Sequence, residues 1–286
     1  MNSTNPKAAF LAGATVGLIV GALVSISNPA AASLRQPRAR RTILRPRHYQ
    51  SGDHFDRYIH EHFFANRSAP GFFVEMGALD GTKGSNTFMF EAALDWRGML
   101  LEANPSSCAK LFENKHRSRS TRLCTAACAE GTPGGALRFE FTTDPFTSAA
   151  VDVMDPAWRK HWHSAANGRP VTGIELVPCA PLARLLRTAG VKEIDFFSLD
   201  VEGSELTVLR TMDWSIPVGV WLIEVQPAQK EAIGALLRSN GYRPYEYLKA
   251  GNEVWVPAGD GARFSSSNAT AWRQYSPPAP PAPAAQ

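Results

Sequence analysis

The sequence predicts an α/β fold, a doubly wound and mostly parallel sheet of seven strands that closes with a C-terminal antiparallel hairpin. Short apolar runs alternate with amphipathic segments through the middle of the chain. Continuous apolar strands separated by helices are typical of a parallel sheet covered on both faces. At the end of this pattern, the turn sequence Ala250-Gly251-Asn252 separates two strand-like runs, as in a hairpin.

The expected elements follow one another along the chain. Strands are expected at 71–77, 97–103, 122–129, 194–201, 218–225, 242–248 and 253–257. Helices are expected at 86–94, 105–114, 181–188, 203–210 and 227–239, the second with a proline in its first turn. The stretch 142–178 shows no motif. In such a sheet, ligands bind beyond the carboxyl ends of the strands.

Composition divides the chain into four parts. With 286 residues, 44% of them hydrophobic, it can bury one sizeable core. We expect a membrane anchor or signal segment at 1–34, a basic linker at 35–49, the globular domain at 50–258 and a disordered tail at 259–286. The tail is rich in Pro, Ala and Ser, so it cannot bury much apolar surface.

The positive charge is concentrated near the N-terminus. The net charge is +4, yet no Asp or Glu precedes Asp53, and six arginines lie between Arg35 and Arg47. The net positive charge therefore comes from the N-terminal segment rather than from the domain, and we expect no nucleic-acid partner.

Residues 8–26 carry no charge and predict a single membrane span. Nineteen helical residues rise about 28 Å, close to the thickness of the hydrocarbon core. Gly13, Gly17 and Gly21 share one helix face, which suits a homodimer of close-packed helices. A glycine-rich anchor without a partner is an equally good interpretation.

Targeting signals in the sequence conflict. Ala30-Ala31-Ala32 resembles a signal-peptidase site, and the acid-free, arginine-rich start also fits an organelle transit peptide. The arginines after the span favour a cytosolic domain. The N-glycosylation sequons at Asn66 and Asn268 can be glycosylated only in the secretory lumen, and so favour a lumenal domain. We favour a single-pass protein of the Golgi or ER, with organelle targeting as the alternative.

The cysteines predict no metal centre. Cys108, Cys124, Cys128 and Cys179 form no CxxC pair and have no histidine at zinc-finger spacing. Their even number permits two disulfides. Cys124 and Cys128 fall in an expected buried strand, where free thiols would act as small hydrophobes.

The first expected strand ends in an acidic, glycine-containing loop, Glu75 to Gly81. Gly77 and Gly81 permit close approach of the backbone, and Glu75 and Asp80 supply carboxylates. Such carboxylates would repel a pyrophosphate, so the loop is no phosphate-binding GxGxxG. They suit a cationic or hydroxyl-rich ligand. S-adenosylmethionine offers an ammonium group, a sulfonium and a ribose diol.

Three further strand ends are acidic. Glu102 follows the second strand, where one carboxylate can hold two vicinal ribose hydroxyls; a solvent-facing or capping role before Pro105 is the alternative. Asp200, Glu202 and Glu205 follow the fourth, where buried carboxylates are costly unless used, although some could favour the next helix N-terminus. Glu224 ends the fifth. Four acidic ends at one edge of a sheet predict a binding site.

Three sequence runs resemble FkbM-type methyltransferases. They are FFVEMGALDGTKGSNTFMFEAALDWRGMLLEANP, IDFFSLDVEGSELTVLRTMDW and VWLIEV, within a similarity that spans about residues 50–257. The resemblance implies a Rossmann-like, class I methyltransferase-like fold. It also implies transfer of a methyl group from S-adenosylmethionine, typically to a hydroxyl oxygen.

The resemblance assigns roles to individual residues. It places the 75–81 loop against the amino-acid part of the cofactor, Glu102 on the ribose, and Ser85 and Asn86 close to the cofactor or the first helix. The third strand's end, 126–130, would neighbour the adenine. The residues expected to bind the cofactor are Glu75, Gly77, Asp80, Gly81, Ser85, Asn86 and Glu102.

We expect one carboxylate to act as the base that removes the acceptor's proton. Asp200 is the first candidate, Glu202 the second and Glu224 the third, since burial among like charges raises a carboxyl pKa. His161 and His163 are an alternative pair, although that segment more simply forms an exposed aromatic and basic face.

The expected activity is O-methylation of a hydroxyl on a glycan or small metabolite. One alternative is a non-catalytic, membrane-anchored protein with a degenerate methyltransferase fold. Another is a nucleotide-sugar-binding enzyme, which would require the phosphate loop that the sequence lacks.

Overall fold

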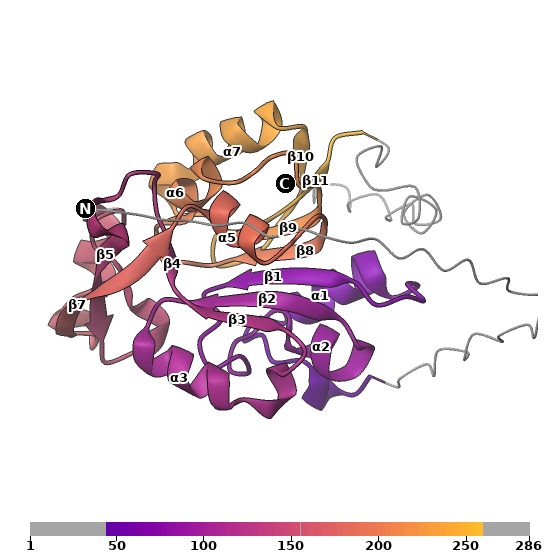
Figure 1. The fold of residues 1–286 in the computed structure, drawn as a ribbon, viewed down its shortest axis with the longest axis horizontal. Helices are drawn as coiled ribbons and strands as arrows, with labels where there is room; N and C mark the ends of the chain where they lie inside the picture. The colour runs from indigo at the N-terminus through magenta and orange to yellow at the C-terminus, as the bar shows by residue number, and fades with distance from the viewer. Residues whose placement is uncertain (1–43, 155, 260–286) are drawn as a thin grey trace, which may run out of the picture. The chain divides into compact units, whose positions relative to one another are not determined.

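The computed structural model describes residues 44–154 and 156–259, which contain a seven-stranded sheet. Figure 1 shows its arrangement. The strand order is β10-β11-β9-β8-β1-β2-β3. The strands are β1 Phe72–Met76, β2 Arg97–Glu102, β3 Thr121–Cys124, β8 Ile194–Leu199, β9 Val218–Glu224, β10 Tyr242–Tyr247 and β11 Asn252–Pro257. The predicted seven strands are confirmed. The sheet is mixed, because β11 runs antiparallel to β9 and β10 while the β1–β2, β1–β8, β2–β3 and β8–β9 pairs are parallel.

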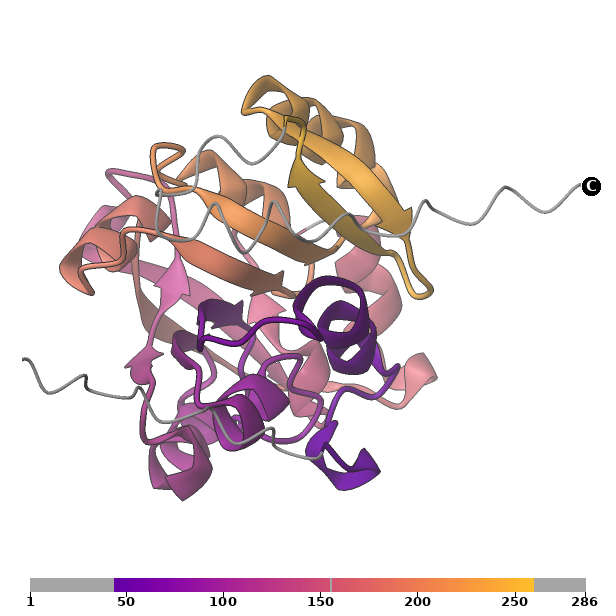
Figure 2. The same ribbon diagram turned by 90° about the vertical axis from the view of Figure 1, so that its right-hand side faces the viewer.

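Helices cover both faces of this sheet (Figures 1 and 2). The chain forms η1 Pro46–His48, α1 Phe55–Ile59, η2 His60–Phe64, α2 Phe88–Leu94, α3 Pro105–Glu113, η3 Lys115–Arg117, α5 Leu182–Thr188, α6 Glu205–Arg210, η7 Pro227–Gln229 and α7 Lys230–Ser239. α1, α2 and α3 pack on one face and α5, α6 and α7 on the other.

Alternation along the strands builds the two cores. In β1, Phe73 contributes to the core under α1–α3, whereas Val74 and Met76 contribute to the core under α5–α7. Successive side chains of a strand point to opposite faces, so an uninterrupted apolar run serves both layers. The helices and strands expected from the sequence on this sheet are found, with ends shifted by a few residues.

The prediction of a single third strand at 122–129 is wrong. β3 ends at Cys124, and the next strand, β4 (Ala126–Ala127), belongs to a second sheet. An apolar run indicates that a segment is buried, but it does not indicate which strand the segment pairs with. The passage of the chain from one sheet to the other at Thr125 therefore cannot be predicted from the local sequence.

The second sheet has the order β4-β7-β5-β6 and comes largely from the stretch without a motif. It comprises β5 Ala136–Thr142, β6 Ala149–Ala150 and β7 Val171–Ala180, with α4 Pro156–Trp162 and the short turns η4 Pro133–Gly135, η5 Pro145–Thr147 and η6 Ala165–Asn167 nearby in sequence. Most of β7 is solvent-exposed. A strand without a regularly buried face lacks the alternation by which strands are predicted.

Both disulfides permitted by the cysteine count are formed. Cys108 of α3 bonds to Cys124 of β3, and Cys128 bonds to Cys179 of β7, each pair with Cα atoms 5.6 Å apart. The second bond joins the chain beyond β4 to β7, next to the parallel β4–β7 pairing.

Several sequence predictions concern residues outside the described ranges. These are the membrane span at 8–26 with Gly13, Gly17 and Gly21, the sequon at Asn268, and nearly all of the Pro-rich tail. Within residues 44–154 and 156–259, no helix has the length and hydropathy needed to cross a membrane.

Candidate functional site

A pocket lies beyond the carboxyl ends of β1, β2 and β8. Its volume is about 670 Å³ including its mouth. Strand ends of the large sheet and the second sheet both contribute side chains: Met76, Gly77, Leu79, Leu101, Glu102, Ala103, Thr125, Ala126, Ala127, Phe139, Pro145, Phe146, Ser148, Ala150, Asp200, Val201, Glu202, Ser204 and Val208. The site therefore lies at the edge of the sheet where the sequence predicted it.

Gly77 lets the ends of three strands come together. Its φ is +83°, and a Cβ at this position would lie 1.9 Å from the carbonyl oxygen of Asp200. Its N–H and that of Ala78 both donate to the carbonyl oxygen of Leu101 at 3.1 Å. Any other residue would clash there, so the backbone itself requires Gly77, whether or not a ligand binds.

Glu102 is the acidic end of β2 and is almost fully buried at the pocket wall. Its Oε2 accepts a hydrogen bond from the N–H of Leu79 and its Oε1 one from the N–H of Asn104, both at 2.7 Å. Burial raises the pKa of Glu102 to about 7, although the backbone hydrogen bonds act in the opposite direction. Each carboxylate oxygen still has a lone pair to offer a ligand hydroxyl.

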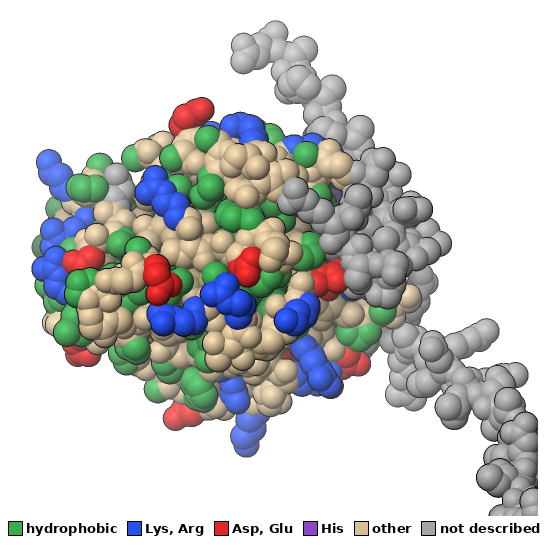
Figure 3. Space-filling model, turned by 45° about the horizontal axis from the view of Figure 1, so that its top comes forward, with side chains coloured by type: hydrophobic (Ala, Val, Ile, Leu, Met, Phe, Trp, Pro, Cys, Tyr) green, Lys and Arg blue, Asp and Glu red, His purple; other side chains and the backbone are tan. Residues whose placement is uncertain are grey.

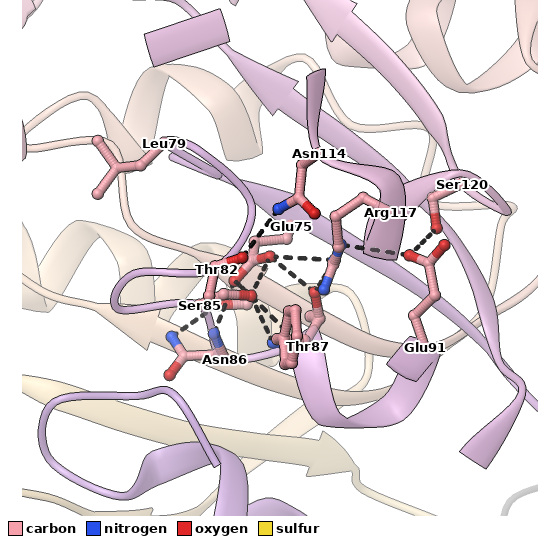
Figure 4. A network of polar contacts seen from close by, with 12 residues as sticks. Glu75, Leu79, Thr82, Ser85, Asn86, Thr87, Glu91, Asn114, Arg117 and Ser120 are labelled. Atoms are coloured by element: carbon pink, nitrogen blue, oxygen red, sulfur yellow. Dashed lines mark hydrogen bonds and ion pairs between the residues drawn. The ribbon is translucent and has the colours of Figure 1, made fainter. Parts of the chain in front are cut away.

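Glu75 takes part in a buried polar network rather than lining the pocket (Figure 4). Its carboxylate accepts hydrogen bonds from Ser85 Oγ at 2.8 Å, the Asn86 N–H at 2.7 Å and Thr87 Oγ1 at 2.6 Å. The Ser-Asn-Thr sequence thus binds the first strand's carboxylate. Ser85 Oγ also accepts the N–H groups of Thr87 and Phe88 at the start of α2.

Arg117 is the buried cation of this network. Its Nη2 donates to Thr87 Oγ1 at 2.6 Å and lies 3.5 Å from Glu75 Oε2, and its Nε lies 3.2 Å from Glu91 Oε2. The side chain is fully buried, and that burial lowers the guanidinium pKa. One arginine therefore pairs with two buried carboxylates, and a buried charge needs such a partner.

Asp80 and Gly81 shape the loop between β1 and α2. Asp80 Oδ1 accepts the N–H groups of Thr82 and Lys83 at 2.8 Å, closing a turn. The Asn114 amide donates to the carbonyl oxygen of Asp80 and to Thr82 Oγ1, both at 2.8 Å. Gly81 has a φ of +77° and packs against Leu111 and Arg117. These contacts hold the loop from the side of α3 and η3 (Figure 4).

The predicted cofactor residues thus separate into two groups. Gly77 and Glu102 line the pocket, whereas Glu75, Asp80, Gly81, Ser85 and Asn86 do not and instead hold its wall in place. Binding by these five stays a prediction. Of residues 126–130, expected beside the adenine, 126 and 127 line the pocket and 128–130 do not.

The three candidate bases lie together. One carboxylate oxygen each from Asp200, Glu202 and Glu224 falls within 4.8 Å of the others, and Asp200 and Glu202 line the pocket. Burial is the main cause that raises the pKa of each. Asp200 and Glu224 also share a hydrogen bond, which lowers the pKa of Asp200 and raises that of Glu224.

Glu205 lies close behind this trio and is fully buried. Its Oε1 accepts the N–H groups of Val201 at 3.0 Å and Gly203 at 3.2 Å, so it braces the turn that carries Asp200 and Glu202. Burial raises the pKa of Glu205 to about 7.

Phe139, Phe146, Ser148 and Ala150 line the pocket without having been predicted. Phe139 and Ala150 come from the second sheet, Phe146 from the turn η5, and Ser148 directly follows η5. The sequence Asp144-Pro145 is a turn signal that indicates a loop here, but nothing local indicates which site it covers.

Neither residue of the alternative histidine pair, His161 and His163, lines the pocket. His161 is exposed. His163 is buried, with Nδ1 2.6 Å from Glu140 Oε2 and Nε2 2.6 Å from the carbonyl oxygen of Thr147. Arg159 also pairs with Glu140. With both ring nitrogens engaged, His163 tethers α4 to η5 at the pocket rim.

Comparisons with solved structures show remote likeness. A putative RNA methyltransferase of Pyrococcus horikoshii is 7% identical, with a TM-score of 0.36 over 72% of this chain and 81% of the other. A glycopeptide N-methyltransferase complexed with S-adenosylmethionine is 14% identical, with a TM-score of 0.32 over 74% and 97%. A precorrin-6y methyltransferase of Geobacter metallireducens is 12% identical, with a TM-score of 0.32 over 66% and 78%. At these scores, the likeness has no bearing on the reaction.

No curated protein matches the chain in sequence. The family model described as the methyltransferase FkbM domain matches residues 75–244, which extend from Glu75 in β1 into the closing hairpin and span more than half of the chain. The match contains the acidic ends of β1, β2, β8 and β9 and both disulfides. The chain therefore belongs to the FkbM methyltransferase family, for which S-adenosylmethionine is the implied methyl donor.

Proposed function

We propose that the protein is an S-adenosylmethionine-dependent O-methyltransferase that acts on a hydroxyl of a glycan or a small metabolite. The observation that carries the proposal is that one pocket brings Glu102 together with Asp200 and Glu202. The pocket therefore combines a carboxylate that can hold a diol with carboxylates that can attract a cation or act as a base.

The pocket residues fit the proposed cofactor. Glu102 would hold the ribose diol, since both of its oxygens are fixed by backbone N–H groups. Ala126, Phe139 and Phe146 supply apolar walls for the adenine. Asp200 and Glu202 have no lysine or arginine partner among the described residues, so they complement the positive charge of a sulfonium and an ammonium group.

Bound S-adenosylmethionine would supply a methyl carbon that an acceptor oxygen attacks as the carbon–sulfur bond breaks. The chain's own contribution is to fix the reactants and to exclude water from between them. The proton of the acceptor hydroxyl passes to a carboxylate of the Asp200–Glu224 pair and then to solvent. Because burial raises the pKa of these carboxyls, they are better matched to this proton than ordinary carboxylates are.

A secretory location and a glycan acceptor are part of the proposal. Two disulfides within one domain favour an oxidising compartment. The sequon asparagine Asn66 is exposed after η2. On the face shown in Figure 3, basic and acidic side chains lie interspersed, which suits a neutral acceptor better than a nucleic acid. The membrane span at 8–26 and pairing through its glycines stay proposals.

Titration of the folded protein with S-adenosylmethionine in a calorimeter tests the proposal. We expect binding to one site per chain, and folded protein that binds none would contradict it. Binding without methylation of any acceptor would favour a non-catalytic protein. Mass spectrometry of glycans and metabolites from cells with and without the gene would then identify the acceptor, as an extra methyl group that depends on the protein.

A glycosidase assay tests the compartment. Protein made in a eukaryotic secretory host would lose mass on removal of N-glycans, and Asn66→Gln would abolish the part of the shift due to that site. An unchanged mass in both proteins would contradict a lumenal domain.

A further inference from the structure

We propose that Asp200, Glu202 and Glu224 form a binding site for one divalent cation that prefers oxygen ligands, such as Mg²⁺, Mn²⁺ or Ca²⁺. The three ligand oxygens lie within 4.8 Å of one another. Oxygens on opposite sides of one ion lie about 4.2 Å apart for Mg²⁺ and about 4.6–5.2 Å apart for Ca²⁺. All three can therefore reach the same ion with little movement.

Charge is the first argument for an ion. Asp200, Glu202, Glu205 and Glu224 gather around one turn and the end of β9, and each acts electrostatically on others of the group. Within residues 44–154 and 156–259, none of them forms an ion pair with Lys, Arg or His, unlike Glu75 and Glu91, which share Arg117. Bound S-adenosylmethionine has a net charge of only +1, too little to balance four carboxylates.

Buried oxygen atoms without a partner are the second and independent argument. Among the described residues, Ser204 Oγ and Glu205 Oε2 are buried without a hydrogen-bond partner, and neither residue is one of the three proposed ligands. Glu205 is 0% exposed and Ser204 is 5% exposed, and Ser204 lines the pocket beside Asp200 and Glu202. Buried polar atoms normally have a partner, so this cluster lacks one that a cation and its water ligands would supply.

Protons are the rival occupants of the site. The hydrogen bond between Asp200 and Glu224 requires a proton on one of the two carboxyl groups. A divalent ion would displace this proton and occupy the space between the carboxylates. The two occupants exclude one another, so direct measurement of ion binding decides between them.

The role of the ion in transfer rests on the proposed function, whereas its binding does not. A bound ion would hold the acceptor hydroxyl through its oxygen and lower the hydroxyl's pKa. The hydroxyl proton would go to a carboxylate oxygen that does not ligate the ion and from there to solvent. The oxygen's electron pair would form the new bond to the methyl carbon, and the departing sulfur would keep the electrons of the broken carbon–sulfur bond.

Titration of the metal-free, folded protein with Mn²⁺ tests the site, with water-proton relaxation and calorimetry as readouts. We expect one ion per chain with a Kd of about 10⁻⁵–10⁻³ M. Asp200→Asn and Glu224→Gln should each weaken binding at least about tenfold, equivalent to about 1.4 kcal/mol. Glu231→Gln, an exposed position of α7, is the matched control and should bind as the wild type does.

Folding is checked by a thermal melt of each variant, and Glu202→Gln is the third ligand variant if another fails to fold. Folded wild type that binds no Mn²⁺ at millimolar concentration would overturn the site, as would binding that none of the folded ligand variants weakens. A parallel titration with S-adenosylmethionine in EDTA separates the two proposals. Cofactor binding without Mn²⁺ binding leaves only the function standing, and the reverse result leaves only the metal site.

Discussion

Glu102 Oε2 accepts a hydrogen bond from the backbone N–H of Leu79 at 2.7 Å, which ties the end of β2 to the loop that follows β1. The same carboxylate holds the N–H of Asn104 through Oε1. The residue expected to bind the ribose is therefore oriented before any ligand arrives. Pre-orientation lowers the entropic cost of binding.

Glu102→Gln should weaken S-adenosylmethionine binding about tenfold or more, because it removes a charge-assisted hydrogen bond and turns an NH2 group toward a backbone N–H. Calorimetric titration measures the change. Glu113→Gln, an exposed carboxylate at the end of α3, is the control and should bind normally. Equal affinity in Glu102→Gln and the wild type would rule out the ribose role.

Affinity for S-adenosylmethionine should fall as the pH is lowered from 8 to 6. Burial raises the pKa of Glu102 to about 7, so the carboxylate form that we propose accepts the ribose hydroxyls is depleted below that pH. Titrations at several pH values measure the slope. In Glu102→Gln the slope should be smaller, and an identical slope would assign the pH dependence to other groups.

The same pKa predicts how stability depends on pH. The folded protein keeps Glu102 protonated up to about pH 7, whereas the unfolded chain releases this proton at the ordinary pKa of 4.5. The unfolded state therefore binds fewer protons between these values, and the contribution of Glu102 to stability is lost as the pH rises through 7. Urea unfolding at pH 5 and 8 should show a larger loss in the wild type than in Glu102→Gln.

Arg117→Met should destabilise the fold by about 3–5 kcal/mol, because it leaves Glu75 and Glu91 buried without their cation. Arg119→Met is the matched control. Its side chain is half exposed beside Asp95, so its loss should cost less than about 1 kcal/mol. Urea unfolding followed by circular dichroism gives both values. Similar costs for the two variants would show that the buried network contributes little.

Loss of the Cys128–Cys179 bond should destabilise the protein by about 4 kcal/mol, and loss of Cys108–Cys124 by about 3 kcal/mol. The bonds close loops of 51 and 16 residues, and the longer loop restricts the unfolded chain more. Paired Cys→Ala variants and unfolding curves measure both losses. Peptide mapping without reductant checks the pairing, and any other pairing would contradict the structure.

Local pattern was enough for much of the fold. The seven strands and the helices between them were predicted because apolar runs and amphipathic periods report burial directly, whatever lies across the sheet. The same logic placed Gly77, Glu102 and Asp200 at strand ends, and parallel strands bring such ends to one edge. The sequence by itself therefore determined the large sheet and the edge at which its site lies.

The tertiary structure decided what each carboxylate does. Glu75 and Glu102 look alike in sequence, yet Glu75 is bound by Ser85, Thr87 and Arg117, and Glu102 faces the pocket. The second sheet, the cysteine pairing and the meeting of Asp200 with Glu224 likewise depend on contacts between distant parts of the chain. Whether a charge is neutralised or left to bind a ligand depends on its neighbours in space. Those neighbours cannot be identified from the spacing of residues along the sequence.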